Sequence, residues 1–275
     1  MDTIVSLAVI SERLQYLPDV LERLLAQTVT PSRVCVWISE EPFLLDEGVA
    51  VEDLPPSVVE WAADETSPVE IRTVDNVGPH RKLVPLLREL FDEADPPLVV
   101  TADDDTLYPE RWLEALQSAY RRNRCAVTFR ARRIQTEGAR LAPYETWPLV
   151  RDEEVLGYRV FSTGKDGLLV HPHMFDERVL EDAFEELCPS RSDAWINGAL
   201  LAGRTPTLNL STSRVLPDET LPRGGDDGRF PDLLREETAP TEANTLTFHN
   251  KRTDDEYIRR TFEHFGVTSM LTGEK

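Results

Sequence analysis

Three consecutive aspartates, Asp103, Asp104 and Asp105, follow directly after a short apolar segment, 98–101, that is typical of a buried strand. Pro109 then predicts the first turn of a helix. Adjacent carboxylates repel one another unless a cation or hydrogen-bond donors neutralise them. Hard oxygen ligands suit Mg²⁺ or Mn²⁺, which bridge phosphate oxygens. The alternative is a solvated acidic turn that caps the helix, and the triplet alone does not separate the two.

A second polar segment, 75–82, follows the predicted strand 69–74 and ends in the basic cluster His80-Arg81-Lys82. Gly78 and Pro79 predict a turn, and the cluster opens a leucine-rich helix from Leu83. Positive charge and helix N–H groups would then lie at the same sheet edge as the aspartates. A diphosphate site is the interpretation that we favour, and an ordinary turn with an exposed lysine is the alternative.

The elements that must position these residues alternate between strand and helix over the first half of the chain. Apolar runs predict strands at 4–10, 34–38, 69–74, 98–101 and 126–129. Helical spacing predicts helices at 18–27, 58–63 and 83–91, and another that carries Trp112, Leu116 and Tyr120. This alternation predicts an α/β fold with a mostly parallel central sheet flanked by helices.

Beyond residue 130 the alternation of strand and helix patterns becomes irregular. An apolar run, 168–170, follows two closely spaced glycines, Gly164 and Gly167, and helical patterns occupy 176–187, 193–202 and 254–265. The segment 216–244 is rich in proline, glycine and charge, and we expect a mobile loop there.

The composition of the chain argues against some classes of binding partner and of cellular location. A formal net charge of −20 argues against nonspecific binding to nucleic acid or an anionic membrane. We expect no integral membrane span and no secretory signal, and hence a cytoplasmic protein, because no apolar run is long enough. The widely spaced Cys35, Cys125 and Cys188 indicate neither a disulfide framework nor a zinc site.

Over residues 3–202 the chain resembles the GT-A fold nucleotide-sugar glycosyltransferases, especially family 2-like members. The matching pieces, in order, are 11–14, 24–28 with Pro31, 37–39, 76–79 with 82–83, 101–105 with 108–109, 112–113, Tyr144, Trp147, 163–164 with Gly167, and 192–195. The resemblance implies one continuous Rossmann-like domain. Residues 1–130 would form the donor-binding half, and residues 131–275 the acceptor-side subdomain with the C-terminal helix.

The resemblance also implies roles for individual residues. Asp105 would bind Mn²⁺ or Mg²⁺, with Asp103 and His249 as further metal ligands, although a lone histidine is more often simply hydrogen bonded. The nucleotide-sugar donor, expected to be a UDP-sugar, would contact Ser11, Arg13, Asp75, Lys82, Asp103, Asp104 and Gly164. Asp103 would face the ribose or sugar, and Asp104 has no more specific task. Capping or surface roles are the alternatives for these residues.

Asp193 is the candidate general base, because inverting transfer needs a group that deprotonates the acceptor hydroxyl. It lies at a predicted helix start, where a favourable interaction with the helix dipole is the alternative role. Ser192 stands where many relatives carry an acid, which leaves Asp193 alone. Trp195 is expected either to stack on an acceptor sugar or to pack in the core.

These expectations describe a metal-dependent, inverting hexosyltransferase that acts on a carbohydrate or glycolipid acceptor in polysaccharide or glycoconjugate synthesis. A nucleotidyltransferase is disfavoured, because Ser11-Glu12-Arg13 is not the glycine-rich basic loop that such enzymes place after the first strand. A noncatalytic protein that binds nucleotide sugars or carbohydrates on the same fold remains the alternative.

Overall fold

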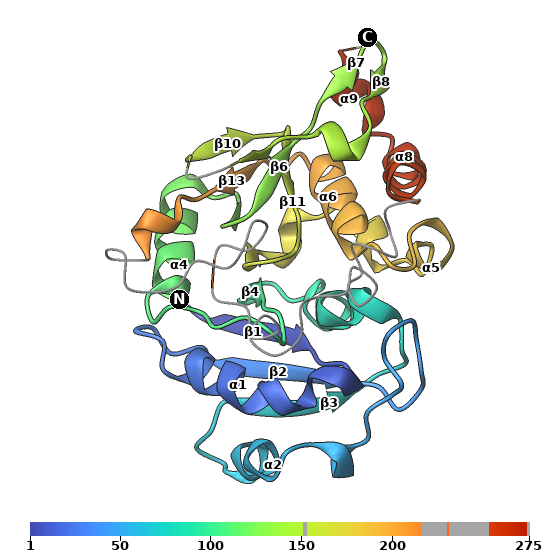
Figure 1. The fold of residues 1–275 in the computed structure, drawn as a ribbon. Coiled ribbons are helices and arrows are strands. Elements are labelled where there is room, and N and C mark those ends of the chain that lie inside the picture. Colours follow the sequence, from blue (N-terminus) through green and yellow to red (C-terminus); the bar gives the residue numbers. More distant parts are fainter. Residues whose placement is uncertain (151–152, 216–229, 231–252, 274–275) are drawn as a thin grey trace.

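The computed structural model describes residues 1–150, 153–215, 230 and 253–273 of the chain. Within these residues an eight-stranded sheet forms the centre of the molecule (Figure 1). Across the sheet the strands follow the order β10 (Val155–Gly157), β13 (Thr207–Asn209), β5 (Ala126–Thr128), β12 (Leu168–Val170), β4 (Leu98–Thr101), β1 (Thr3–Ala8), β2 (Arg33–Ile38) and β3 (Val69–Thr73). Strands β1 to β4 are parallel, and β12 lies antiparallel between β4 and β5. The predicted α/β class with a mostly parallel central sheet is confirmed.

Helices cover both faces of this sheet. One face packs against α1 (Leu17–Leu25), α2 (Pro56–Ala63) and α4 (Trp112–Asn123). The other packs against α3 (Val84–Leu90), α6 (Ser192–Ala202) and α8 (Asp254–His264). Successive side chains of a strand point to opposite faces of the sheet. In β1, Val5 and Leu7 therefore pack on the face covered by α1, α2 and α4, and Ile4 packs on the face covered by α3, α6 and α8.

A smaller sheet lies beside the β10–β13 end of the main sheet (Figure 1). Its three strands run in the order β11 (Val160–Ser162), β6 (Ala131–Arg133) and β9 (Leu149–Val150). The remaining regular elements are the hairpin β7 (Thr136–Glu137) and β8 (Arg140–Leu141), and the helices α5 (Phe184–Leu187) and α9 (Thr268–Thr272). Short 3₁₀ turns connect them: η1 (Ser11–Tyr16), η2 (Val51–Asp53), η3 (Gly78–Lys82), η4 (Tyr144–Thr146), η5 (Pro172–Met174), η6 (Glu177–Leu180) and η7 (Thr212–Arg214).

Two predicted helix boundaries are wrong. Pro109 does not open a helix, because α4 begins at Trp112, whose N–H donates to the Pro109 carbonyl in a preceding turn. The pattern over 176–187 is not one helix but η6 followed by α5. The Asp176 side chain accepts from the N–H of Arg178 and so starts only a short 3₁₀ turn.

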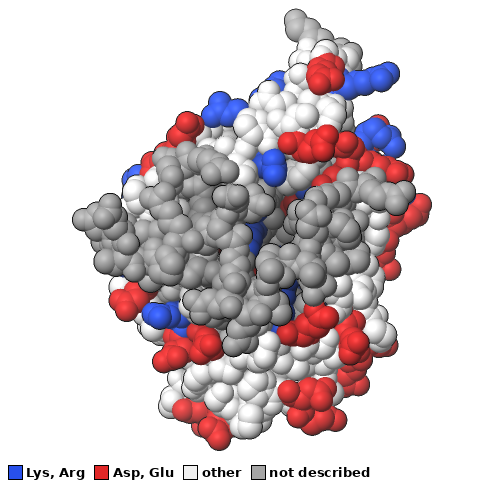
Figure 2. All heavy atoms as spheres, in the orientation of Figure 1, with Lys and Arg blue, Asp and Glu red and all other residues white. Residues whose placement is uncertain are grey.

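Other expectations concern composition and the C-terminal part of the chain. All three cysteines are buried and free. Among the described residues, no helix combines the length and apolarity needed to cross a bilayer. Figure 2 shows acidic side chains over much of the rim of one face, in line with the net charge of −20. The expected loop at 216–244, apart from Phe230, and His249 lie outside the described residues.

Candidate active site

The carboxyl ends of β1, β3 and β4 place three loops at one edge of the sheet. The hydroxyl of Ser6, inside β1, donates to the Lys82 carbonyl at 2.6 Å and so fixes η3 against that strand. The N–H of Ile10, after β1, donates to Asp104 Oδ2 at 3.2 Å. Ligands bind at this edge in open α/β sheets. The aspartates and the basic turn are thus brought together, as predicted.

Arg13 forms an ion pair with two aspartates of the triplet. Its Nη1 lies 2.7 Å from Asp104 Oδ1 and 2.9 Å from Asp105 Oδ2. Burial alone would lower the pKa of Arg13, but the charges of Asp104 and Asp105 outweigh it and raise the pKa. Asp104 therefore joins the loop after β1 to the loop after β4, which gives it a scaffolding contact at the edge of the site.

Lys82 and Asp103 form the second ion pair of the edge. Lys82 Nζ lies 3.0 Å from Asp103 Oδ1 and 3.2 Å from the Gly164 carbonyl oxygen. Asp103 Oδ2 accepts from the N–H of Asp166 at 3.2 Å. The Tyr108 hydroxyl in turn accepts from the N–H of Asp103 at 2.8 Å. The interpretation of Lys82 as an exposed turn residue is wrong, since its side chain is only 14% exposed.

The aspartates at the two ends of the triplet differ in electrostatic environment. Burial raises the pKa of Asp105 to about 6, because Arg13 only partly compensates for the low polarity and for the neighbouring Asp104. Burial also acts on Asp103, but the charges of Lys82 and Lys165 outweigh it, so its pKa lies below the usual value. The surroundings therefore favour the ionised form of Asp103 more than that of Asp105.

A small cavity of about 130 Å³ opens beside these ion pairs. Asp103, Asp104, Arg13 and Lys82 line it, but Asp105 does not. The rest of its wall contains Asn76 and Arg81 from the 75–82 segment, and also Phe43 and Asp46, which were not predicted from the sequence. The cavity is therefore polar on the triplet side and has an aromatic ring on the opposite loop.

Asp46 and Arg81 form a buried ion pair in this wall, with Arg81 Nη2 2.5 Å from Asp46 Oδ2. Arg81 Nε and Nη1 are buried and have no hydrogen-bond partner in the described part of the chain. Asn76 Nδ2 also donates to Asp46, at 3.2 Å. The only local signal for Asp46 was its place in a long acidic loop, because its partner Arg81 is 35 positions away in the chain.

The prediction that the basic cluster at 80–82 as a whole brings positive charge to the site is wrong. His80 is 1% exposed, and burial lowers its pKa to about 4, so it is neutral at pH 7. Arg81 is neutralised by Asp46. The cluster therefore contributes one cationic side chain, Lys82, that faces the triplet, together with unpaired N–H groups of Arg81.

Two of the predicted donor-binding residues, Asp75 and Ser11, take no part in the ion pairs of Arg13 and Lys82. Asp75 is exposed and lines a neighbouring cavity of about 440 Å³, not the 130 Å³ cavity. Ser11 donates its N–H to Asp46 Oδ1 at 3.0 Å, and its hydroxyl accepts from the N–H of Glu47 at 2.9 Å. The contacts of Ser11 hold the 43–48 loop against η1.

Gly164 brings the donor edge and the acceptor side together. Its φ is +73°, and a Cβ placed on it would lie 3.9 Å from Lys82 Nζ and 4.0 Å from Asp193 Cβ. Asp193, in the first turn of α6, is therefore adjacent to the Lys82–Asp103 pair. Burial raises the pKa of Asp193, while Arg191 opposes that shift.

Trp195 lies in the core rather than in the site. It is 0% exposed, and its Nε1 donates to the Val179 carbonyl at 3.0 Å. Of the two roles left open for Trp195, packing is the one that its burial supports.

The carboxylates of the triplet have donor chemistry that fits a hard divalent cation. Asp103 and Asp105 offer oxygen ligands, and each forms an ion pair with one cationic side chain, Lys82 or Arg13. Among the described residues, no group of three or more His, Cys, Asp or Glu side chains is arranged to hold a metal ion. Mg²⁺ is commonly bound by one or two carboxylates plus phosphate oxygens, so two aspartates suit a cation that arrives with a diphosphate.

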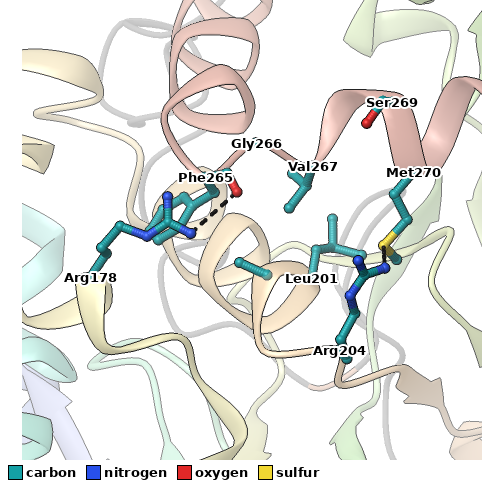
Figure 3. Close-up of a pocket in the computed structure, with 9 residues that line it drawn as sticks. Arg178, Leu201, Arg204, Phe265, Gly266, Val267, Ser269 and Met270 are labelled. Carbon is teal, nitrogen blue, oxygen red and sulfur yellow. Dashed lines mark hydrogen bonds between the residues drawn. The ribbon is translucent and has the colours of Figure 1, made fainter. Parts of the chain in front are cut away.

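A further cavity of about 330 Å³ lies away from this edge, between α6, α8 and α9 (Figure 3). Arg178 lies on its Phe265 side, where its guanidinium donates to the His264 and Phe265 carbonyls and pairs with Asp176. Arg204 lies on the other side and donates to Met270 Sδ. None of the predicted site residues lines this cavity.

Comparison with known proteins gives structural likenesses only. No protein-family model and no curated protein matches the chain. Solved structures that resemble it include S. aureus TarS 1–349 in complex with UDP, with TM-score 0.48 and 15% identity, covering 77% of this chain and 58% of that one. TarS 1–349 in complex with UDP-GlcNAc has TM-score 0.45 and 12% identity over 98% of this chain and 73% of that one. A 4-diphosphocytidyl-2C-methyl-D-erythritol synthase has TM-score 0.45 and 11% identity over 80% of this chain and 93% of that one.

Proposed function

We propose that the protein is a glycosyltransferase that moves a sugar from a nucleotide-diphosphate sugar to a hydroxyl acceptor. The supporting observation is the meeting of three side chains, Lys82, Asp103 and Asp193, at Gly164. Lys82 Nζ contacts both Asp103 and the Gly164 carbonyl, and the Cα of Gly164 faces Lys82 and Asp193. A lysine ammonium, one carboxylate of the triplet and a candidate base thus lie around a backbone position that has no side chain.

In this proposal the donor lies along the sheet edge. The nucleobase and ribose occupy the 130 Å³ cavity, which Asn76, Arg13 and Asp104 help to line with groups able to hydrogen-bond a base or ribose. The diphosphate lies beside Lys82, whose ammonium group counters the negative charge that develops as the diphosphate leaves. Asp105 and Asp103 would hold Mn²⁺ or Mg²⁺, which supplies Lewis-acid stabilisation of the leaving diphosphate.

Asp193 acts as the general base. Its carboxylate takes the proton of the acceptor hydroxyl, and the hydroxyl oxygen forms a bond to the sugar C1 while the bond from C1 to the diphosphate breaks. A single displacement of this kind inverts the configuration at C1. Burial that raises the pKa of Asp193 also makes it a better proton acceptor than a solvated aspartate. We propose a hexosyl donor and a carbohydrate or glycolipid acceptor.

Release of UDP tests the proposal. We expect the wild-type protein with Mn²⁺ to release UDP from at least one of a panel of UDP-hexoses, because water can replace the acceptor. Asp193→Asn should lower this release by at least about 100-fold, in the range of general-base contributions, with UDP affinity retained. Glu22→Gln, an exposed carboxylate on α1, is the control and should leave the rate unchanged.

Two results would contradict the proposal. Metal-dependent UDP binding by the wild type without any turnover would support a noncatalytic binding protein instead. Full activity of Asp193→Asn would show that another group accepts the proton.

A further inference from the structure

One edge of the Arg191 guanidinium contacts the carboxylate of Asp193, the candidate base. Its Nε lies 3.2 Å from Asp193 Oδ1, and its Nη2 donates to Asp193 Oδ2 at 3.2 Å. The Arg191 side chain is only 6% exposed. The Nη2 contact is a hydrogen bond, whereas the Nε contact is an ion-pair contact without hydrogen-bond geometry. Two contacts from one planar guanidinium constrain the position of a carboxylate more than the single point charge of a lysine would.

The other edge of Arg191 reaches the C-terminal helix. Its Nη1 forms an ion pair with Asp254, the first residue of α8. The ring of Tyr144 lies 4.1 Å from the guanidinium carbon, and the N–H of Tyr144 donates to Asp255 Oδ1 at 2.6 Å. Arg191 therefore joins three segments that are distant in sequence: the start of α6, the start of α8 and the turn η4.

Asp193 and Asp254 share this one guanidinium. Burial raises the pKa of each, and Arg191 opposes the shift in both. The titratable or charged groups that act on Asp193 come from η3, η4, the segment before α6, and α8, and they are Lys82, Tyr144, Cys188, Arg191 and Asp254. Because Asp254 carries negative charge beside Arg191, it reduces the positive potential that Asp193 experiences.

We propose that Arg191 is a positioning residue for Asp193, and that the ion pair of Arg191 with Asp254 links the basicity and orientation of that carboxylate to the docking of α8. This inference rests on the proposed function only in calling Asp193 the base. The coupling between Asp193, Arg191 and Asp254 is a property of the protein alone, so it is measurable without substrate.

The test is a titration of Asp193 by carboxyl ¹³C NMR in the full chain labelled at aspartate, with the signal assigned by its loss in Asp193→Asn. Asp254→Asn removes the competing negative charge, so the midpoint of Asp193 should fall by about half a unit to one unit. Arg191→Met removes the positive partner, so the midpoint should rise by about one unit or more. Arg191→Lys keeps the positive charge without the planar group that has several donors. The midpoint of Asp193 in this variant should lie between its values in Arg191→Met and in the wild type.

Asp255→Asn is the matched control, since Asp255 is also in the first turn of α8 but bonds to the Tyr144 N–H instead of Arg191. It should move the midpoint by less than about 0.2 units. Asp254→Asn keeps the test valid if Arg191→Met does not fold. Equal midpoints in wild type and Asp254→Asn would overturn the inference. The turnover of Asp193→Asn separately tests the proposed function, so the two failures are distinguishable.

Discussion

Individual side chains at the sheet edge show which parts of a site can be predicted from sequence. The types of Asp103, Asp105 and Lys82 and their places after predicted strands were sufficient to expect them together, because parallel strands end at one edge. The pair Asp46–Arg81 was missed, since neither residue has a local pattern that names its partner. Long-range ion pairs are set by how loops meet, and one sequence does not contain that information.

His80 illustrates how burial changes the role of a titratable residue. It stacks on Phe184 with ring centroids 4.2 Å apart, and its Nε2 lies 2.9 Å from the Cys188 carbonyl oxygen. Its place in the basic cluster 80–82 predicted a positively charged side chain. In the structure it is a buried, neutral ring that joins η3 to the segment before α6.

The pH dependence of stability follows from this burial. The folded pKa of His80 is about 4 against 6.5 in its usual state, so the unfolded chain takes up the proton first as the pH falls. The contribution of neutral His80 to the free energy of unfolding is fully present above pH 6.5 and is lost as the pH falls below it. Between pH 8 and pH 5 this loss is about 2 kcal/mol. His80→Gln should lose about 2 kcal/mol less over that range, as measured by urea unfolding. An equal loss in both proteins would show that His80 is not held neutral.

Secondary-structure elements were predicted well where a short apolar run has clear limits. The strand at 98–101 has the bounds of β4, and the helix expected from 193–202 differs from α6 by one residue. The prediction at 176–187 was wrong because apolar residues at helical spacing also occur where two short turns pack on the same core. Local capping by Asp176 determined the structure there.

The turn that precedes β12 depends on a glycine. Gly167 has φ +98°, and a Cβ on it would lie 2.6 Å from Trp112 Cζ2. The same indole donates its N–H to the Asp166 carbonyl at 3.0 Å, and Asp166 donates to Asp103. Trp112 on α4 thus supports the loop that carries Gly164 and contacts the triplet.

Gly167→Ala should lower the free energy of unfolding by about 3 kcal/mol, because backbone strain and a clash with Trp112 add together. Gly138→Ala is the control, since Gly138 also has positive φ, +59°, but a Cβ there has no neighbour within 4 Å. It should cost only about 1 kcal/mol. Urea unfolding of both variants measures the difference, and equal losses would contradict the role assigned to the Trp112 contact.

Over the whole molecule, the sheet order and the distribution of charge explain why a site forms at this edge. The chain carries a net charge of −20, yet Arg13, Lys82 and Arg191 are gathered where β1, β3, β4 and α6 begin or end. Each of these cations faces a carboxylate that the sequence analysis had named. The composition predicted the overall charge, but only the fold reveals which basic side chains face inward.

The central claim is that this edge binds a nucleoside diphosphate. Calorimetric titration of the protein with UDP, with and without Mn²⁺, tests it most directly, alongside Lys82→Met, Asp105→Asn and the control Arg88→Met, an arginine of α3 that pairs with Asp182. We predict that UDP binds to the wild type more tightly with Mn²⁺, and that Lys82→Met weakens binding by about 10- to 100-fold. Asp105→Asn should remove the effect of Mn²⁺, and Arg88→Met should behave as wild type. Absence of UDP binding to the wild type under both conditions, or unchanged affinity in Lys82→Met, would contradict the account.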